Sequence, residues 1–197
     1  MSEIRVEHSD FIAVYNNLIP AEVCKTIVKE FERFKALGTV HAGATSGGVN
    51  KSVKNSLDAD FMASAASATY LAEEVFPLMQ EAYQEYMDQY PILANSMDGH
   101  EMTGFQVQKY EDRGSGYHAF HVEAGSKATS NRVVTWLLYL TDIEKGGETE
   151  FLNQRLRLKP SVGTLVYFPT GYTHPHRGNP ALGTELKYVA TGWLTFT

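Results

Sequence analysis

The sequence lacks several features that would indicate particular classes of protein. Cys24 is its only cysteine, which excludes an internal disulfide and any zinc or iron–sulfur site built from several cysteines. A metal ion would therefore have to be held by histidine and carboxylate side chains. No apolar run approaches the roughly 20 residues that a membrane-spanning helix needs, so we expect no membrane contact.

Acidic residues outnumber basic ones, with 23 Asp and Glu against 17 Lys and Arg, so the formal net charge is −6. General affinity for nucleic acid comes from lysine and arginine side chains that displace counterions, so we expect no nucleic-acid partner. The first ten residues, MSEIRVEHSD, carry charges where a secretory leader would be apolar. These absences predict a cytoplasmic protein, and they say nothing about its oligomeric state.

What the chain does contain fits one compact unit. With 197 residues and 43% hydrophobic content, it is long enough for one well-buried core and short for two ordinary domains. We predict a single domain over residues 1–197, made of a helical support over 1–100 and a β-rich core over 101–197.

The first half shows mainly helical spacing. Pro20 stands where a helix could start, and apolar residues follow at three- and four-residue steps as far as Phe34. A second helical region is predicted from about Asp60 to Tyr90, with Pro77 kinking or dividing it. Between them, residues 39–58 are rich in Gly, Ser and Asn, which predicts either a disordered loop or a lid.

The second half changes to short segments with the composition of β-strands, separated by Gly-rich turns. These segments read GFQVQKY, YHAFHVE, RVVTWLLYL, TEFLN, TLVYFP and LKYVATGWLTF. They predict a β-sandwich or barrel with the helices packed on its outside.

Histidines in this β-rich half provide candidate metal ligands. In a regular strand over YHAFHVE, His121 and Glu123 project from the same face. A third ligand from His174 or His176 would give two imidazoles and one carboxylate, the set that non-haem Fe(II) oxygenases use. A His and a Glu two residues apart are also common as a plain surface pair, and the pattern by itself does not decide between the two.

Lys187 follows His176 by eleven residues and begins a strand whose same face carries Val189 and Thr191. A lysine directed into an apolar barrel must find an anion, because an unpaired buried ammonium is very costly. A dicarboxylate that chelates iron at one end would meet that need at the other. The alternative is a lysine that reaches the barrel rim and stays solvated.

Four stretches in this order resemble the prolyl 4-hydroxylase branch of the Fe(II)/2-oxoglutarate dioxygenases. They read YEDRGSGYHAFHVE, RVVTWLLYLTDIEKGGETEF, KPSVGTLVYFPTGYTHPHRGNP and LKYVATGW, and the resemblance covers about Phe105 to Phe196. It implies an α+β, mainly β fold, a distorted double-stranded β-helix of the jelly-roll or cupin-like kind, with N-terminal helices packed on the outside.

The resemblance also implies site residues. It identifies His121 and His176 as iron ligands and Lys187 as the partner of the far carboxylate of 2-oxoglutarate. The hydroxyl side chains of Tyr110 and Thr135 would line the cosubstrate pocket, and Trp193 would be an aromatic residue on the final strand close to the cosubstrate. The GGETEF stretch is interpreted as scaffold, and His174 either as a residue of the pocket wall or as one that supports the iron ligands from behind.

In one position the chain departs from the family pattern, which has aspartate two residues after the first histidine where this chain has Glu123. Glutamate is a competent ligand whose extra methylene moves the carboxylate outward, so we expect it to be the third ligand. The competing hypothesis is that Glu123 has lost coordination, which would leave a two-histidine site with impaired chemistry.

The implied activity is hydroxylation that consumes Fe(II)-bound 2-oxoglutarate and O2 and releases succinate and CO2, with ascorbate as an added reductant. A prolyl residue of a peptide or protein is the leading substrate, and Tyr117 is expected near it. A free amino acid or small metabolite is an alternative substrate. Two other classes stay open, an inactive ligand-binding barrel and a zinc hydrolase, and the latter leaves Lys187 unexplained.

Overall fold

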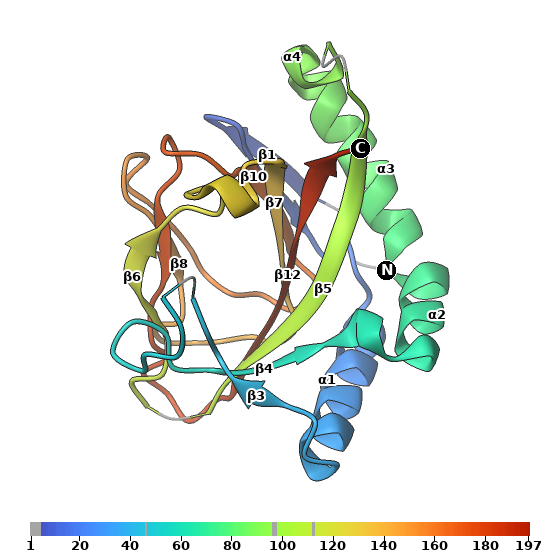
Figure 1. Cartoon of the computed structure of the whole chain (residues 1–197). Helices are drawn as coiled ribbons and strands as arrows, with labels where there is room; N and C mark the ends of the chain where they lie inside the picture. The colour runs from blue at the N-terminus through green and yellow to red at the C-terminus, as the bar shows by residue number, and fades with distance from the viewer. Residues whose placement is uncertain (1–4, 46, 96–97, 112) are drawn as a thin grey trace.

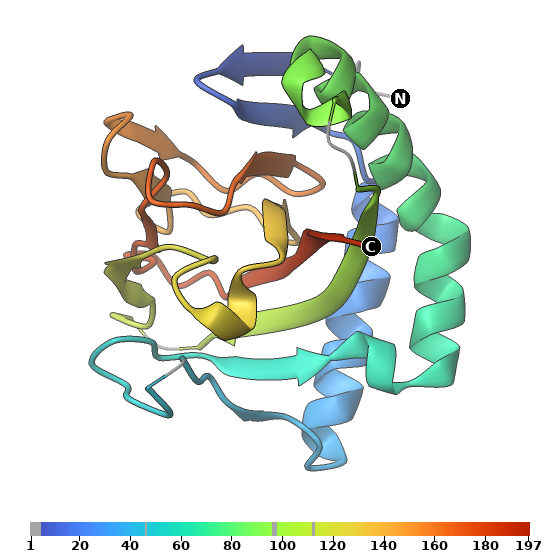
Figure 2. The same cartoon turned by 45° about the horizontal axis from the view of Figure 1, so that its top comes forward.

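The computed structural model of the chain describes residues 5–45, 47–95, 98–111 and 113–197. Two antiparallel sheets face each other, and the long helices cover the outer side of the larger sheet (Figures 1 and 2). The larger sheet has the order β1-β2-β10-β7-β12-β5-β4-β3. Its strands are β1 (Arg5–Ser9), β2 (Ile12–Asn16), β3 (His41–Ala42), β4 (Leu57–Asp60), β5 (His100–Tyr110), β7 (Arg132–Tyr139), β10 (Leu165–Pro169) and β12 (Lys187–Phe196).

The smaller sheet has the order β6-β11-β8-β9 and consists of short strands. These are β6 (Tyr117–His121), β8 (Thr149–Phe151), β9 (Leu156–Leu158) and β11 (His176–Gly178). In both views the smaller sheet lies on the side of β5 and β12 that is opposite to α2 and α3 (Figures 1 and 2). The space between the sheets is therefore lined by side chains from both.

The helices are α1 (Ala21–Ala36), α2 (Ala65–Glu74), α3 (Phe76–Gln89) and the short α4 (Pro91–Ala94), with 3-10 turns at Phe61–Ala63 and Lys127–Thr129. Pro20 precedes α1, as predicted. The second helical region is broken at Val75, beside Pro77, so the expected division is confirmed. Among the described residues, no helix is long and apolar enough to cross a membrane.

Side chains alternate between two hydrophobic layers along the strands of the larger sheet. On β10, Leu165 and Tyr167 belong to the layer that packs against the helices, whereas Val166 and Phe168 belong to the layer between the sheets. This alternation follows from the two-residue period of a strand. It requires that both faces of the sheet be apolar, because helices cover one and the smaller sheet covers the other.

The helical layer and the β-rich half share one core. The ring of Phe31 on α1 packs edge-on against Tyr188 on β12, with centroids 5.7 Å apart, and both belong to the larger apolar cluster. The apolar core therefore runs from the helices into the β-rich half, and the single domain stays a prediction.

The interpretation of residues 1–100 as helical support is incomplete. The β1–β2 hairpin adds to the larger sheet beside β10, and β4 pairs with β5 at the other side. The apolar run that ends at Tyr15 lacks clear alternation because both of its faces are covered, and a short run of this kind is ambiguous in sequence.

The Gly/Ser-rich segment 39–58 has more structure than a loop. Within its described residues it contains β3 and the start of β4, which pair with each other. It also bonds to the edge of the smaller sheet, because Asn55 N–H donates to the Gly116 carbonyl and His118 N–H donates to the Val53 carbonyl. The segment is thus docked over β6.

Candidate active site

Three side chains that can ligate a metal converge beside β6 and β11. His121 ends β6 and His176 begins β11, and the two residues are partners in the antiparallel pairing. Glu123 Oε1 lies 3.3 Å from His121 Nε2 and 3.6 Å from His176 Nε2. The three ligand atoms all lie within 4.8 Å of one another, a spacing that suits one ion with bonds of about 2.1 Å.

The second nitrogen of each imidazole sets its protonation. His121 Nδ1 lies 3.1 Å from the Ala119 carbonyl oxygen, and His176 Nδ1 lies 3.1 Å from the His174 carbonyl oxygen. A carbonyl oxygen only accepts hydrogen bonds, so each Nδ1 carries the proton and donates it. Both Nε2 atoms consequently present a lone pair toward Glu123, which is the tautomer that metal coordination needs.

Burial and neighbouring groups shift two pKa values in the cluster. Burial lowers the pKa of His121, which keeps its ring neutral at physiological pH. Burial alone would raise the pKa of Glu123, but its contacts with His121 and His176 outweigh that cost and hold this pKa well below its usual range. Neutral imidazoles and an ionised carboxylate form the ligand set of a divalent metal.

A small cavity of about 50 Å³ extends from this cluster between the two sheets, toward Lys187. Lys187 is 3% exposed, and its Nζ makes no hydrogen bond or ion pair with any residue that the structure describes; the ring of Tyr110 lies 5.1 Å away. Burial lowers the pKa of Lys187 to about 8. Lys187 and Val189 share the inner face of β12, as the strand period predicts.

The hydroxyl groups predicted for this pocket also line it. Thr135 Oγ1 is buried and has no hydrogen-bond partner among the described residues. Tyr110 stands opposite Lys187 in the β5–β12 pairing, and its hydroxyl donates to Gln108 Oε1 at 2.8 Å. A buried cation and an unsatisfied hydroxyl in one cavity leave room for an anionic group of a ligand.

A wider cavity of about 420 Å³ lies on the other side of the ligand cluster. Tyr117 lines both cavities, and its ring stacks on His121 with centroids 3.6 Å apart. Trp193 lines the wider cavity, and its Nε1 donates to Glu123 Oε2 at 3.0 Å. Trp193 thus contacts the carboxylate of the candidate ligand Glu123, and its expected place close to the cosubstrate stays a prediction.

His174 lines neither cavity, so of its two expected roles the pocket wall was wrong; its carbonyl oxygen does contact His176 Nδ1. Its Nε2 lies 2.7 Å from the Asp10 carbonyl oxygen and its Nδ1 lies 2.9 Å from Thr173 Oγ1. One ring nitrogen therefore contacts the turn of the β1–β2 hairpin and the other contacts the neighbouring Thr173, so neither is available to a metal. The regular strand begins only at His176, after Pro175, so the two histidines need not share a face.

Two groups near the site were not predicted. Arg132, at the start of β7, donates through Nη1 to the Glu123 carbonyl oxygen at 3.0 Å and to Glu123 Oε2 at 3.4 Å.

Lys54 forms a buried ion pair with Asp58, in which Nζ lies 2.6 Å from Oδ2. It also lines the wider cavity near Tyr117. Arg132 opens one of the stretches that carry the resemblance and Lys54 lies in none of them, but no role was assigned to either residue from the sequence. Their contacts are to residues distant in sequence or in another strand.

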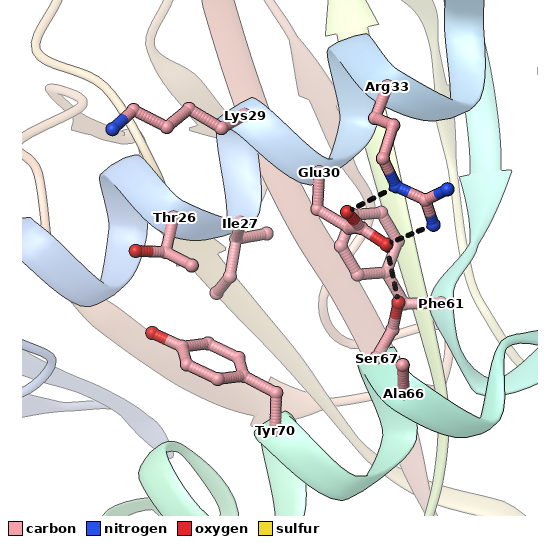
Figure 3. A pocket seen from close by; sticks show the side chains of 9 residues that line it. All are labelled: Thr26, Ile27, Lys29, Glu30, Arg33, Phe61, Ala66, Ser67 and Tyr70. Carbon is pink, nitrogen blue, oxygen red and sulfur yellow. Dashed lines mark hydrogen bonds and ion pairs between the residues drawn. The ribbon is translucent and has the colours of Figure 1, made fainter. Parts of the chain in front are cut away.

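Another pocket, of about 380 Å³, lies between α1 and α2 (Figure 3). Two of its charged groups are engaged, because Glu30 accepts hydrogen bonds from both Arg33 and Ser67, whereas Lys29 is exposed. The side chains of Ile27, Phe61 and Tyr70 supply apolar surface. This pocket has neither the metal-ligating set nor the buried unpaired cation of the cavity between the sheets.

Comparisons with known proteins agree with this geometry. Residues 105–195 match the model of the 2OG-Fe(II) oxygenase superfamily. Prolyl 4-hydroxylase 13 of Arabidopsis thaliana is 32% identical over 144 residues, which cover 62% of this chain and 48% of that protein. The chain therefore spans about half the length of this relative.

Solved structures share the fold. A prolyl hydroxylase from Trichoplax adhaerens, in complex with a peptide fragment of the hypoxia inducible factor oxygen degradation domain, superposes with a TM-score of 0.75 at 19% identity, over 95% of this chain and 84% of that one. A Pseudomonas putida prolyl-4-hydroxylase superposes with a TM-score of 0.68 at 20% identity, over 93% and 92%. These likenesses confirm the predicted double-stranded β-helix with helices on its outside.

The matched family implies Fe(II), 2-oxoglutarate and O2 as metal, cosubstrate and oxidant. The ligand cluster, the free Nε2 lone pairs and the unpaired Lys187 and Thr135 fit the first two of these. Residues 105–195 therefore match the 2OG-Fe(II) oxygenase superfamily, and the relative named above is a prolyl 4-hydroxylase.

Proposed function

We propose that the chain hydroxylates a prolyl residue of a peptide or protein, with Fe(II) held by His121, Glu123 and His176. The observation that carries the proposal is that this ligand cluster and the unpaired Lys187 line one cavity between the sheets. A second anchoring point in the cavity that also holds the proposed metal ligands is what a dicarboxylate cosubstrate requires. A zinc hydrolase would have no use for it.

The chain's own residues would bind and orient the reactants. Lys187 would hold the far carboxylate of 2-oxoglutarate, with Thr135 donating its free hydroxyl and Tyr110 turning its own from Gln108 toward the same group. When bound, iron and 2-oxoglutarate supply oxidising power from O2, with succinate and CO2 as coproducts and one oxygen atom entering a substrate C–H bond. Ascorbate would serve as reductant for iron that has become oxidised.

The wider cavity is the proposed place of the substrate. Its walls include the aromatic rings of Tyr117 and Trp193, and it adjoins the ligand cluster on the side away from Lys187. An apolar prolyl ring suits such walls, and the peptide bound to the Trichoplax adhaerens relative supports a peptide substrate here. We further propose that the chain acts as one domain in the cytoplasm.

The test is to purify the protein without oxygen, add Fe(II) and 2-oxoglutarate, admit O2, and follow succinate by NMR with and without proline-rich peptides. Succinate that is lost in His176→Ala and in Glu123→Ala would establish the oxygenase and its ligands, and hydroxyproline in the peptide would identify the substrate. Folded, iron-loaded protein that forms no succinate with peptides, free amino acids or small metabolites would favour an inactive barrel. Turnover retained in Glu123→Ala would show that the carboxylate is not an essential ligand.

Affinity for 2-oxoglutarate should depend on pH through Lys187. Because burial lowers the pKa of Lys187 to about 8 in the ligand-free protein, the ammonium that pairs with the carboxylate is lost as pH rises through that value. The dissociation constant, measured by calorimetry with Mn(II) in place of Fe(II), should be nearly flat below about pH 7 and rise about tenfold per pH unit above about pH 8.

Lys187→Arg provides the control for this pH dependence, because a guanidinium stays protonated throughout the range. Its dissociation constant should therefore be independent of pH between about 7 and 9. A wild-type affinity that is equally flat would contradict the role of Lys187. Tyr110 and Glu148 are the other titratable groups that act on the ammonium, and both are retained in the control.

A further inference from the structure

The two carboxylate oxygens of Glu123 have different neighbours. Oε1 faces His121 and His176. Oε2 accepts a hydrogen bond from Trp193 Nε1 at 3.0 Å and one from Arg132 Nη1 at 3.4 Å. The carboxylate is thus oriented so that one oxygen points to the metal position and the other is held by donors from the larger sheet.

The two donors also support each other. The guanidinium of Arg132 lies 3.4 Å above the ring of Trp193, a contact that combines cation–π attraction with stacking. Both residues belong to paired strands, since Arg132 begins β7 and Trp193 lies near the end of β12. Their relative position is therefore fixed by the sheet.

The backbone of Glu123 is held in the same network. Glu123 N–H donates to the Thr170 carbonyl at 3.0 Å, the Thr170 hydroxyl donates to the Arg132 carbonyl at 2.8 Å, and Arg132 Nη1 donates to the Glu123 carbonyl at 3.0 Å. These bonds close a ring through three residues. Main chain and side chain of Glu123 are therefore both fixed before any metal binds.

We propose that Arg132 and Trp193 are positioning residues that adapt the site to glutamate as the carboxylate ligand. Glutamate has one more rotatable bond than aspartate, so an unsupported side chain would lose more conformational freedom on binding a metal. Holding Oε2 removes that freedom in advance and leaves Oε1 as the single coordinating oxygen. The inference rests on the proposed iron site, and it concerns how the site is built.

The test measures metal binding. Trp193→Phe keeps an aromatic ring for Arg132 but removes the N–H donor, and Arg132→Met removes the other donor. Each should raise the dissociation constant for Co(II) by about 10- to 100-fold, the range found when the supporting partners of a metal ligand are removed. The visible absorption of bound Co(II) should also change, because its intensity and position report the number and arrangement of ligands.

A double-mutant cycle separates this role from a general structural one. The shorter side chain of Glu123→Asp should withdraw the carboxylate from both donors. Adding Trp193→Phe to Glu123→Asp should then change the Co(II) dissociation constant less than about twofold, far short of the effect expected in the wild type. An equal effect in both backgrounds, or no effect in the wild type, would overturn the proposal.

The chain offers a matched control in Trp136→Phe. Trp136 lies on the same sheet, and its buried Nε1 has no hydrogen-bond partner among the described residues. This variant should lower the melting temperature and leave the Co(II) affinity and spectrum unchanged. If Glu123→Ala bound Co(II) as tightly as the wild type, the proposed metal site itself would be contradicted. That outcome differs from a failure of the positioning role alone.

Discussion

Lys187→Met should make the ligand-free protein more stable and its complex with 2-oxoglutarate much weaker. Because burial lowers the pKa of Lys187 from 10.5 to about 8, the unfolded chain holds this proton more tightly than the folded one. Between these two values the unfolded state carries more protons, so the stability of the wild type rises with pH in that window. Below it, the buried ammonium costs about 3 kcal/mol.

Replacing the ammonium by an apolar side chain of similar length removes that cost. The free energy of unfolding of Lys187→Met, measured with urea at neutral pH, should exceed that of the wild type by about 2–3 kcal/mol. Its affinity for 2-oxoglutarate should fall by about 100- to 1000-fold, because the far carboxylate is left without its charged partner in a buried site.

Lys109→Met is the matched control, since Lys109 is a buried lysine of the same sheet that does have partners. Its Nζ lies 2.8 Å from Glu32 Oε1 and 3.0 Å from Glu111 Oε1. Removing it should destabilise the protein and leave the affinity for 2-oxoglutarate unchanged. If Lys187→Met also lowered stability, Lys187 would have an internal partner and the anion site would lie elsewhere.

Asp58→Asn should cost about 3 kcal/mol of folding free energy. The Asp58 carboxylate pairs with Lys54 and also accepts a hydrogen bond from Ser56 at 2.7 Å. Asparagine is nearly the same size but uncharged, so Lys54 would remain buried as an unpaired cation. Urea unfolding measures the loss, and hydrogen exchange at the Asn55 and His118 amides should accelerate as the segment that docks over β6 opens.

Adding Lys54→Met to Asp58→Asn should restore part of the lost stability, because the unpaired cation is then gone. A loss below about 1 kcal/mol in Asp58→Asn would indicate that the pair is solvated, as exposed ion pairs are. Restored stability with a raised Michaelis constant for peptide would be consistent with the position of Lys54 in the wall of the wider cavity.

Local patterns were enough to predict the elements that carry the candidate site. The period of a strand placed Lys187 with Val189, and the proline at position 77 divided the helical region because it cannot continue a helix. The spacing of His121 and Glu123 predicted that both could contact one ion, and their ligand atoms do lie together. Their roles in binding iron stay predictions.

Features that depend on distant contacts were not predictable. Pro175 made the strand around His174 and His176 irregular, so alternation could not decide between them. Arg132 and Trp193 act on Glu123 from two separate strands of the larger sheet, and no local pattern reports such a contact. The hairpin β1–β2 was missed because β2 is covered on both faces and loses its alternation, and the segment 39–58 because its order comes from docking on β6.

The division of the site between two sheets has a mechanical consequence. Two of the proposed metal ligands belong to strands of the smaller sheet, whereas Lys187, Thr135 and Tyr110 stand on the larger one. A cosubstrate that contacts both groups adds a further link between layers that already meet through apolar packing and through hydrogen bonds such as that from the Tyr139 hydroxyl to Thr149. Metal and cosubstrate should therefore bind cooperatively and reciprocally, and together they should slow the separation of the layers more than either does alone.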